Sequence, residues 1–286
     1  MVAVLLQTPA ARASTGSPWP VPGASLGEAE TLTPAVQGQR FEARWADCAE
    51  DVRAAQRLRY LVFAQEMGAH LAPPAGSEPG LDIDHFDAFC DHLLVHAVTP
   101  LWVGLGPVVG TYRVLGPRAA VCAGGFYADA EFDLSPLRSL RATALELGRS
   151  CVHPAWRSGG VIMALWTALC RYMGQHGLDT MIGCASVKLG GETSATGLWE
   201  SLRHTHGVAP QWQVTPRVAF PPGTEKAALA GAGRACAPPL IKGYLRCGAR
   251  LLGPPALDLA FNTGDLPMML RLDELTPRFR KHVLSP

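Results

Sequence analysis

Residues 145–173, LELGRSCVHPAWRSGGVIMALWTALCRYM, form the stretch that decides the fold. Its first part alternates apolar and polar residues as a strand does, with Glu146 and Arg149 interleaved, until Pro154 ends the pattern. After the glycines that follow, the apolar residues recur at the spacing of a helix: Ile162, Leu165, Trp166, Leu169 and Met173. A strand that passes through a glycine turn into a helix predicts an α/β fold.

The turn itself is a candidate anion site. A helix N-terminus presents unpaired backbone N–H groups, and these bind anions, most often phosphate. Arg157 adds a positive charge just before Ser158, Gly159 and Gly160. An ordinary strand-to-helix connection has the same local pattern, so the turn alone does not decide between the two interpretations.

Composition narrows the class of protein. The chain has 286 residues, of which 48% are hydrophobic, and this is enough for one moderately large domain with an extensive core. A net charge of +1 argues against a nucleic-acid-binding protein. None of the eight cysteines forms a C-x-x-C pair, so we expect no metal site, no disulfides and a reduced, cytoplasmic protein. No stretch has the length and composition of a transmembrane helix.

The chain divides into a predicted disordered tail, residues 1–38, and one domain, residues 39–286, with a flexible connection at 221–239. Helices are expected at 50–67, 136–144 and 195–204, and 116–126 is expected to be a loop. Residues 240–252 fit a short basic helix or a pair of strands. Further strands are expected at 40–45, 92–98, 108–114, 179–187, 212–220 and 258–272. This order predicts a mixed, strongly twisted sheet flanked by helices.

Several short motifs occur in a fixed order along residues 40–283. They are RYLVF at 59–63, DHFD at 84–87, ELGRSCV at 146–152, MIGCAS at 181–186, PPLIKGY at 238–244 and FNTGD at 261–265. The set resembles the GNAT-type acyltransferases and is most similar to the bacterial ornithine N-alpha-acyltransferases that begin ornithine-lipid synthesis. It shares a framework with the acyl-homoserine-lactone synthases, which carry a serine where Gly148 stands here.

This resemblance implies a GNAT-like fold and an N-acyltransferase reaction. The donor would be a fatty or 3-hydroxyfatty acyl thioester on the phosphopantetheine arm of acyl carrier protein, with no bound cofactor. The acceptor would be the α-amine of L-ornithine, and the product lyso-ornithine lipid. Peripheral contact with the inner membrane is left open. Two alternatives remain: a signal synthase of the acyl-homoserine-lactone type, and a non-catalytic GNAT-like binding module.

Amide formation from a thioester needs a base, because an amine is mostly protonated at neutral pH. Glu146 is the candidate, since it interrupts an apolar strand where burial would raise its pKa. An exposed glutamate ion-paired to Arg149 is the alternative. Arg149 lies three residues further on, so only a bulge near Gly148 would bring both side chains to one face.

The remaining site residues have two sources: the resemblance implies the charged network, and the chemistry of the donor and the acceptor indicates the others. Arg59, Asp84, Asp87 and Arg149 would form a charged network beside the acyl site, or a purely structural ion-pair cluster. Arg157, Ser158, Gly159 and Gly160 would bind the donor's phosphate. Asp258, Asn262 and Asp265 would bind the acceptor, with the two carboxylates on its δ-ammonium group, although a plain turn also fits the last two.

A basic stretch is the candidate surface for the acidic carrier protein. Arg234, Lys242, Arg246 and Arg250 occur there without an intervening acidic residue. A solvated basic face is the alternative.

Overall fold

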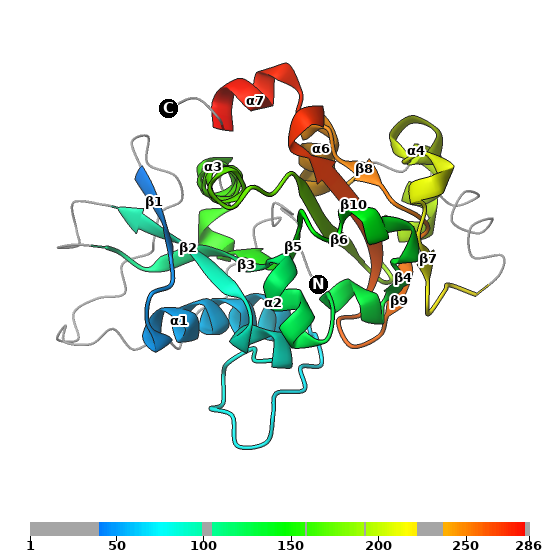
Figure 1. The fold of residues 1–286 in the computed structure, drawn as a ribbon. Coiled ribbons are helices and arrows are strands. Elements are labelled where there is room, and N and C mark those ends of the chain that lie inside the picture. The colour runs from blue at the N-terminus through cyan, green and yellow to red at the C-terminus, as the bar shows by residue number, and fades with distance from the viewer. Residues whose placement is uncertain (1–39, 99–104, 158, 192, 222–236, 284–286) are drawn as a thin grey trace, which may run out of the picture.

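The computed structural model describes residues 40–98, 105–157, 159–191, 193–221 and 237–283. The predicted tail at 1–38 and most of the predicted connection at 221–239 lie outside these ranges. Within them the chain folds around one long sheet (Figure 1).

The sheet has the strand order β1-β2-β3-β5-β6-β10-β8, and β9 also pairs with β10. All pairs are antiparallel except β5 with β6, which is parallel, so the sheet is mixed as predicted. The bounds are β1 Arg40–Trp45, β2 Asp91–Val98, β3 Val108–Leu115, β5 Ala144–Val152, β6 Thr180–Lys188, β8 Arg250–Leu251, β9 Ala256–Asp258 and β10 Thr263–Arg271.

Helices cover both faces of this sheet (Figure 1). α1, Ala49–Tyr60, continues as the π-helix η1, Leu61–Glu66, and packs on β2, β3 and β5 from one side. α3, Gly159–His176, packs on β1, β2 and β3 from the other, where its apolar residues join the main core. The remaining helices are α2 Pro117–Ala123, α4 Ala195–His206, α6 Pro239–Cys247 and α7 Pro277–Val283.

Short elements connect these parts. Five are 3-10 turns: η2 His85–Ala88, η3 Tyr127–Ala130, η4 Ser135–Leu140, η5 Pro154–Trp156 and η6 Pro210–Trp212. Of these, η2 and η3 contribute to the site described below. A sixth, η7, spans Leu272–Glu274, and a small second sheet pairs β4, Phe132–Asp133, with β7, Thr215–Pro216.

Three sequence predictions were wrong in detail. The expected loop at 116–126 contains α2, which Pro117 begins and Gly124, in the left-handed conformation at φ 89°, ends. The expected edge strand at 212–220 reduces to β7, since Pro216 has no N–H for a longer ladder. The expected helix at 136–144 is the 3-10 turn η4, because β5 already begins at Ala144.

The parallel pair β5–β6 separates partway along its length. The two strands pair only from Ala144 opposite Thr180 to Leu147 opposite Gly183. Beyond that point β5 continues with β3 to Val152, while β6 continues with β10 to Lys188. The edges that face each other past Leu147 are therefore not paired with one another.

Among the described residues, no helix has both the length and the apolar character needed to span a bilayer.

Candidate active site

β5 carries a bulge where the sequence analysis required one. Its register with β3 passes from Thr111 opposite Cys151 to Arg113 opposite Gly148, so β5 has one residue more than its partner. Arg149 lies at this irregularity with φ 50°, a left-handed conformation that is rare for a residue with a side chain. Glu146 contacts the backbone of Tyr127 and Arg149 lies over the Tyr127 ring, so both side chains are on one face.

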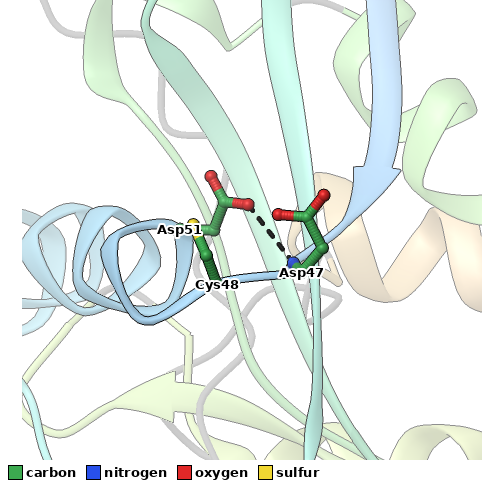
Figure 2. A group of neighbouring side chains, drawn as sticks. All are labelled: Asp47, Cys48 and Asp51. Carbon is green, nitrogen blue, oxygen red and sulfur yellow. Dashed lines mark hydrogen bonds between the residues drawn. The ribbon is translucent and has the colours of Figure 1, made fainter.

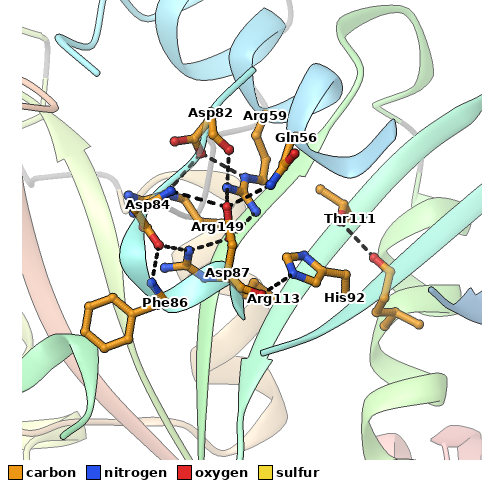
Figure 3. Close-up of polar contacts among 11 residues, drawn as sticks. Gln56, Arg59, Asp82, Asp84, Phe86, Asp87, His92, Thr111, Arg113 and Arg149 are labelled. Carbon is orange, nitrogen blue, oxygen red and sulfur yellow. Dashed lines mark hydrogen bonds and ion pairs between the residues drawn. The ribbon is translucent and has the colours of Figure 1, made fainter. Parts of the chain in front are cut away.

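Six charged side chains form one network between α1, η2 and the strands β3 and β5 (Figure 3). The structure thus brings together the four predicted members and adds two that the sequence analysis missed. The members are Arg59, Asp82, Asp84, Asp87, Arg113 and Arg149.

Arg59 is the centre of this network and is 0% exposed. Its Nε donates to Asp82 Oδ2 at 2.8 Å, and Nη1 and Nη2 donate to the two carboxylate oxygens of Asp87 at 2.9 Å each. Gln56 Nε2 also donates to Asp87 Oδ2, at 3.0 Å. Such a two-pronged pair fixes orientation as well as charge, so α1 is held against the η2 loop.

The other two arginines reach the same carboxylates from the sheet. Arg149 donates through Nε to Asp82 Oδ2 at 3.1 Å and through Nη2 to Asp84 Oδ2 at 2.9 Å. Arg113 Nη1 donates to Asp84 Oδ1 at 2.6 Å and to Asp87 Oδ1 at 2.8 Å. Each aspartate therefore bridges two arginines.

The network stays ionised despite its burial. Burial alone would raise the pKa of Asp87, but Arg59 and Arg113 outweigh it and hold that pKa well below its usual range. Burial would also raise the pKa of Asp84, and Arg113 and Arg149 lower it. The charges are therefore matched within the site.

Glu146 is 3% exposed and has a different environment. Its Oε2 accepts a hydrogen bond from the backbone N–H of Tyr127 at 2.7 Å, and its Oε1 from that of Ala128 at 2.8 Å. These are the first residues of η3, so the carboxylate holds that turn on β5. Burial raises the pKa of Glu146 to about 7, although the two N–H donors act in the opposite direction. The alternative of an exposed glutamate paired to Arg149 is wrong.

Two cavities meet at Gly148. The first lies beside Glu146 and is also lined by Phe86 and Tyr127. The second lies where β5 and β6 separate. Gly148 lines both, and the second is bounded almost wholly by apolar residues: Leu147, Trp166, Met181, Ile182, Ala185, Met268, Met269 and Leu270.

The glycine turn opens α3 as the sequence indicated, with Gly159 and Gly160 exposed at the helix start. Arg157 forms an ion pair with Glu66 at the end of η1, with Nη1 to Oε1 at 2.6 Å. Ser158 lies outside the described residues. The candidate phosphate ligand Arg157 is therefore already ion-paired with an acidic residue that the sequence did not indicate.

The predicted acceptor residues separate into two kinds. Asp258 and Asp265 lie together, and Glu131 joins them, with one carboxylate oxygen of each within 4.8 Å of the others. Asn262 stands in a left-handed turn at φ 54°, and its carbonyl accepts from the N–H of Leu189. The turn conformation explains Asn262 without a ligand.

The predicted docking residues lie on or just after α6, which packs against the middle of α3 through Tyr244 and Trp166. Lys242 and Arg246 are on this helix, and Arg246 is exposed. Arg250 faces Glu274, with Nε and Oε2 3.7 Å apart. Arg234 lies outside the described residues.

A second acidic group, Asp47, Cys48 and Asp51, lies at the start of α1 (Figure 2). Asp51 accepts from the backbone N–H of Asp47 at 3.3 Å and is ion-paired with Arg44. These partners explain the position of Asp51 by its contacts at the N-terminus of α1, without a bound metal ion.

Comparison with known proteins agrees with this geometry. The model of the acetyltransferase (GNAT) domain family matches residues 58–167, which run from the network through the glycine turn into α3. The fold and this site define a GNAT-type acyltransferase. The chain is 37% identical to an L-ornithine N(alpha)-acyltransferase of Rhodobacter capsulatus over 84% of its own length and 93% of that protein. It is 38% identical to the protein of the same name in Rhizobium meliloti, over 84% and 82% of the two chains. The chain belongs to the L-ornithine N(alpha)-acyltransferase family.

Among solved structures, the AHL synthase LasI is similar with a TM-score of 0.49 and 14% identity, over 86% of this chain and 95% of that one. FeeM, an N-acyl amino acid synthase from uncultured soil microbes, is similar with a TM-score of 0.47 and 12% identity, over 87% and 97%.

Proposed function

We propose that this acyltransferase moves a fatty or 3-hydroxyfatty acyl group from acyl carrier protein to the α-amine of L-ornithine. The observation that carries the proposal is Glu146, a buried carboxylate whose pKa burial raises to about 7 and which faces a cavity beside the separated strands. A base with such a pKa removes a proton from an amine at neutral pH and then releases it. The names of the family's members supply ornithine as the acceptor.

In this reaction Glu146 would take a proton from the α-ammonium group. The freed amine attacks the thioester carbonyl, and the C–S bond breaks as the C–N bond forms. The attacking nitrogen gives up its second proton, and the thiolate, which leaves with the electron pair of the C–S bond, gains it to become a thiol. The acyl chain would enter the apolar cavity between the separated strands, and Gly148 would lie where the two substrates meet.

The donor arm would enter along the unpaired edges of β5 and β6, with its phosphate at the start of α3 near Arg157. The donor carries the phosphopantetheine, so we propose no resident cofactor. We propose that the reaction takes place in the cytoplasm. The product, an N-acyl ornithine, is amphiphilic, so we propose that it is released at the surface of the inner membrane.

The test is acyl transfer measured with acyl carrier protein carrying a defined chain and with ornithine, the product being identified by mass spectrometry. Acyl-ornithine supports the proposal, a lactone supports a signal synthase, and no new species supports a binding module.

The Glu146→Gln variant sharpens this test. We expect turnover to fall by roughly a hundredfold or more, as for the loss of a positioned base. In the wild type, kcat/KM should rise with pH, with the midpoint of the rise at about pH 7, because the base must be ionised. The variant should not show this rise. Gln also replaces one acceptor facing the η3 N–H groups, so the melting temperature is measured alongside. Near-normal turnover in a folded variant would remove Glu146 from this role.

A further inference from the structure

The turn η3 contacts both oxygens of the candidate base. The backbone N–H of Tyr127 donates to Glu146 Oε2 at 2.7 Å, and that of Ala128 donates to Oε1 at 2.8 Å. These two residues open the 3-10 turn, so their N–H groups have no acceptor inside it and bind one outside. An ionised carboxylate has about four acceptor positions, so two donors fix its orientation and leave the other positions to a substrate.

The same two donors act on the charge of Glu146. Burial raises the pKa of Glu146 to about 7, and the N–H groups of Ala128 and Tyr127 act in the opposite direction. Without these donors the pKa would lie higher still. A carboxyl group that is protonated at neutral pH takes no proton from an amine, so the turn supplies what a buried base needs.

The carboxylate of Asp129 holds the turn itself. Its Oδ2 accepts from the backbone N–H of Phe126, the residue before the turn, at 2.8 Å. Arg141 Nη1 donates to Asp129 Oδ1 at 2.7 Å, and the Arg141 guanidinium lies 4.7 Å from the centre of the Phe126 ring. Gly125, at φ 140°, leaves room for the carboxylate, because a Cβ there would lie 2.7 Å from Asp129 Oδ2. Asp129 is thus linked to Glu146 through one short turn.

Tyr127 also connects the turn to the charged network. The guanidinium carbon of Arg149 lies 5.2 Å from the centre of the Tyr127 ring. The rings of Phe86 and Tyr127 are 5.5 Å apart, centre to centre, and both line the cavity beside Glu146. One residue therefore contacts the base through its backbone and the network through its ring.

We propose that η3 is the positioning element of this active site, with Tyr127 and Asp129 as positioning residues that act through Glu146. The inference rests on the proposed function, which gives Glu146 its role, and it adds residues that hold the base. The turn fixes the carboxylate before the substrates bind, so the base needs no reorientation during the reaction.

The experiment compares two substitutions at one position. Tyr127→Ala removes the ring and keeps the N–H group, whereas Tyr127→Pro removes both. Proline fits here, because Tyr127 is the first residue of the turn and Phe126 before it has φ −75° and ψ 153°. The pH dependence of kcat/KM is measured for acyl transfer. The ionisation of Glu146 is followed separately by NMR of carboxyl-labelled glutamate, with Glu146→Gln assigning the signal.

We expect both pH midpoints to be higher in Tyr127→Pro than in Tyr127→Ala by about 1–2 units, because a hydrogen bond to the charged form is lost. The sign follows from the chemistry, since a donor to the carboxylate favours its ionised state. A turn with a structural role alone would lower the melting temperature of the variants and leave both midpoints unchanged. That result would overturn the inference.

Asp129 tests the second part of the inference. Asp129→Ala should raise the same midpoints and lower kcat more than it changes KM, whereas Asp129→Asn keeps an oxygen for the Phe126 N–H and should restore part of the loss. Glu200→Ala is the control, because Glu200 is 25% exposed against 31% for Asp129 and pairs with Arg203 on α4 at 2.9 Å. Midpoints that move no more in Asp129→Ala than in the control would contradict the role of Asp129.

The two readouts separate this inference from the proposed function. A midpoint of the NMR signal that shifts in Tyr127→Pro, in an enzyme without acyl transfer, would leave the turn as the element that holds Glu146 while the proposed function falls. Acyl transfer with the same pH profile in Tyr127→Ala and Tyr127→Pro would retain the function and overturn the inference.

Discussion

The two buried clusters of charge in this molecule are built in opposite ways. The network around Arg59 contains three arginines and three aspartates, and each aspartate bridges two arginines. The group around Asp265 contains three carboxylates, and neither Asp258 nor Asp265 is ion-paired with an arginine or lysine of the described residues. In the first cluster an arginine of the fold faces every carboxylate, whereas the second cluster consists of carboxylates alone.

The pKa shifts record the same difference. In the network, arginines hold the pKa values of Asp84 and Asp87 below their usual range even though burial acts to raise them. In the carboxylate group, burial and Glu131 raise the pKa of Asp265 to about 7. Burial is common to both, so the difference in direction reflects the arginines that lie beside Asp84 and Asp87.

The largest effect should come from breaking the network around Arg59. Arg59→Ala leaves Asp82 and Asp87 buried with too few partners, and we expect a loss of about 3–5 kcal/mol in unfolding free energy, with activity falling in parallel. Urea unfolding measures the loss. Arg53→Ala is the control, because Arg53 pairs with Glu50 on the exposed face of α1 and should matter by less than about 1 kcal/mol. A loss no larger than that of the control would show that the network does not stabilise the fold.

Neutralising Asp265 should change stability in the opposite direction. The pKa of Asp265 is raised in the folded state, so the folded protein retains a proton that the unfolded chain releases, and stability falls as pH rises from about 4 to about 7. Asp265→Asn removes this loss. The variant's unfolding free energy relative to the wild type should therefore be higher at about pH 8 than at about pH 5. A relative stability that does not change with pH would contradict the raised pKa.

The network should also act as a unit. Arg59 and Asp84 do not touch but share Asp82, Asp87 and the arginines between them. The sum of the unfolding free energies lost in Arg59→Ala and in Asp84→Ala should differ from the loss in the double variant by about 0.5–3 kcal/mol. The reason is that the second change acts on a network already broken. Unfolding of the three variants measures this coupling. Strictly additive losses would mean that the two ends are independent.

The smallest effect concerns charges outside both clusters. Reversing Lys242 and Arg246 to glutamate should raise the KM for acyl carrier protein and leave turnover at saturating donor unchanged. The rise in KM should become smaller when salt is added, because exposed charges are screened within about 10 Å at about 0.1 M ionic strength. Arg250 is left in place because it faces Glu274. Reversal of Arg53, which is partly exposed on α1, and of Arg171, which is exposed on α3, is the matched control. An unchanged KM at low salt would move the docking surface elsewhere, with Arg278, Arg280 and Lys281 tested next.

Local pattern was sufficient for much of the fold. The strand, turn and helix of 145–173 appear as β5, η5 and α3, and residues 40–45 form β1. α2 was missed because its small residues resemble a loop, although Pro117 at its start and Gly124 at its end are the usual boundary signals. The long edge strand at 212–220 was wrong because alternation does not show whether a partner strand is present.

The site was less accessible to sequence reasoning. Arg113 is a single charged residue in an otherwise apolar strand, which is the same pattern that indicated Glu146. The sequence analysis overlooked it. Glu131 had no signal, because only the fold brings η3 next to β9 and β10. The same holds for Glu66, which meets Arg157 across the molecule. Contacts between distant segments follow from topology and not from spacing.

The extra residue in β5 changes the phase of the strand. Up to Leu147, odd-numbered residues point toward α3, as Leu145 and Leu147 do in the main core. Past the bulge the even-numbered ones do, so Val152 joins that core and Ser150 lines the apolar cavity, while Cys151 packs on the α1 side. Without this shift Arg149 would point into the cavity proposed for the acyl chain. The one additional residue thus keeps the charged side chains of β5 on one face of the sheet and the apolar cavity on the other. Deleting one residue at the bulge would turn the side chains that follow it to the opposite faces.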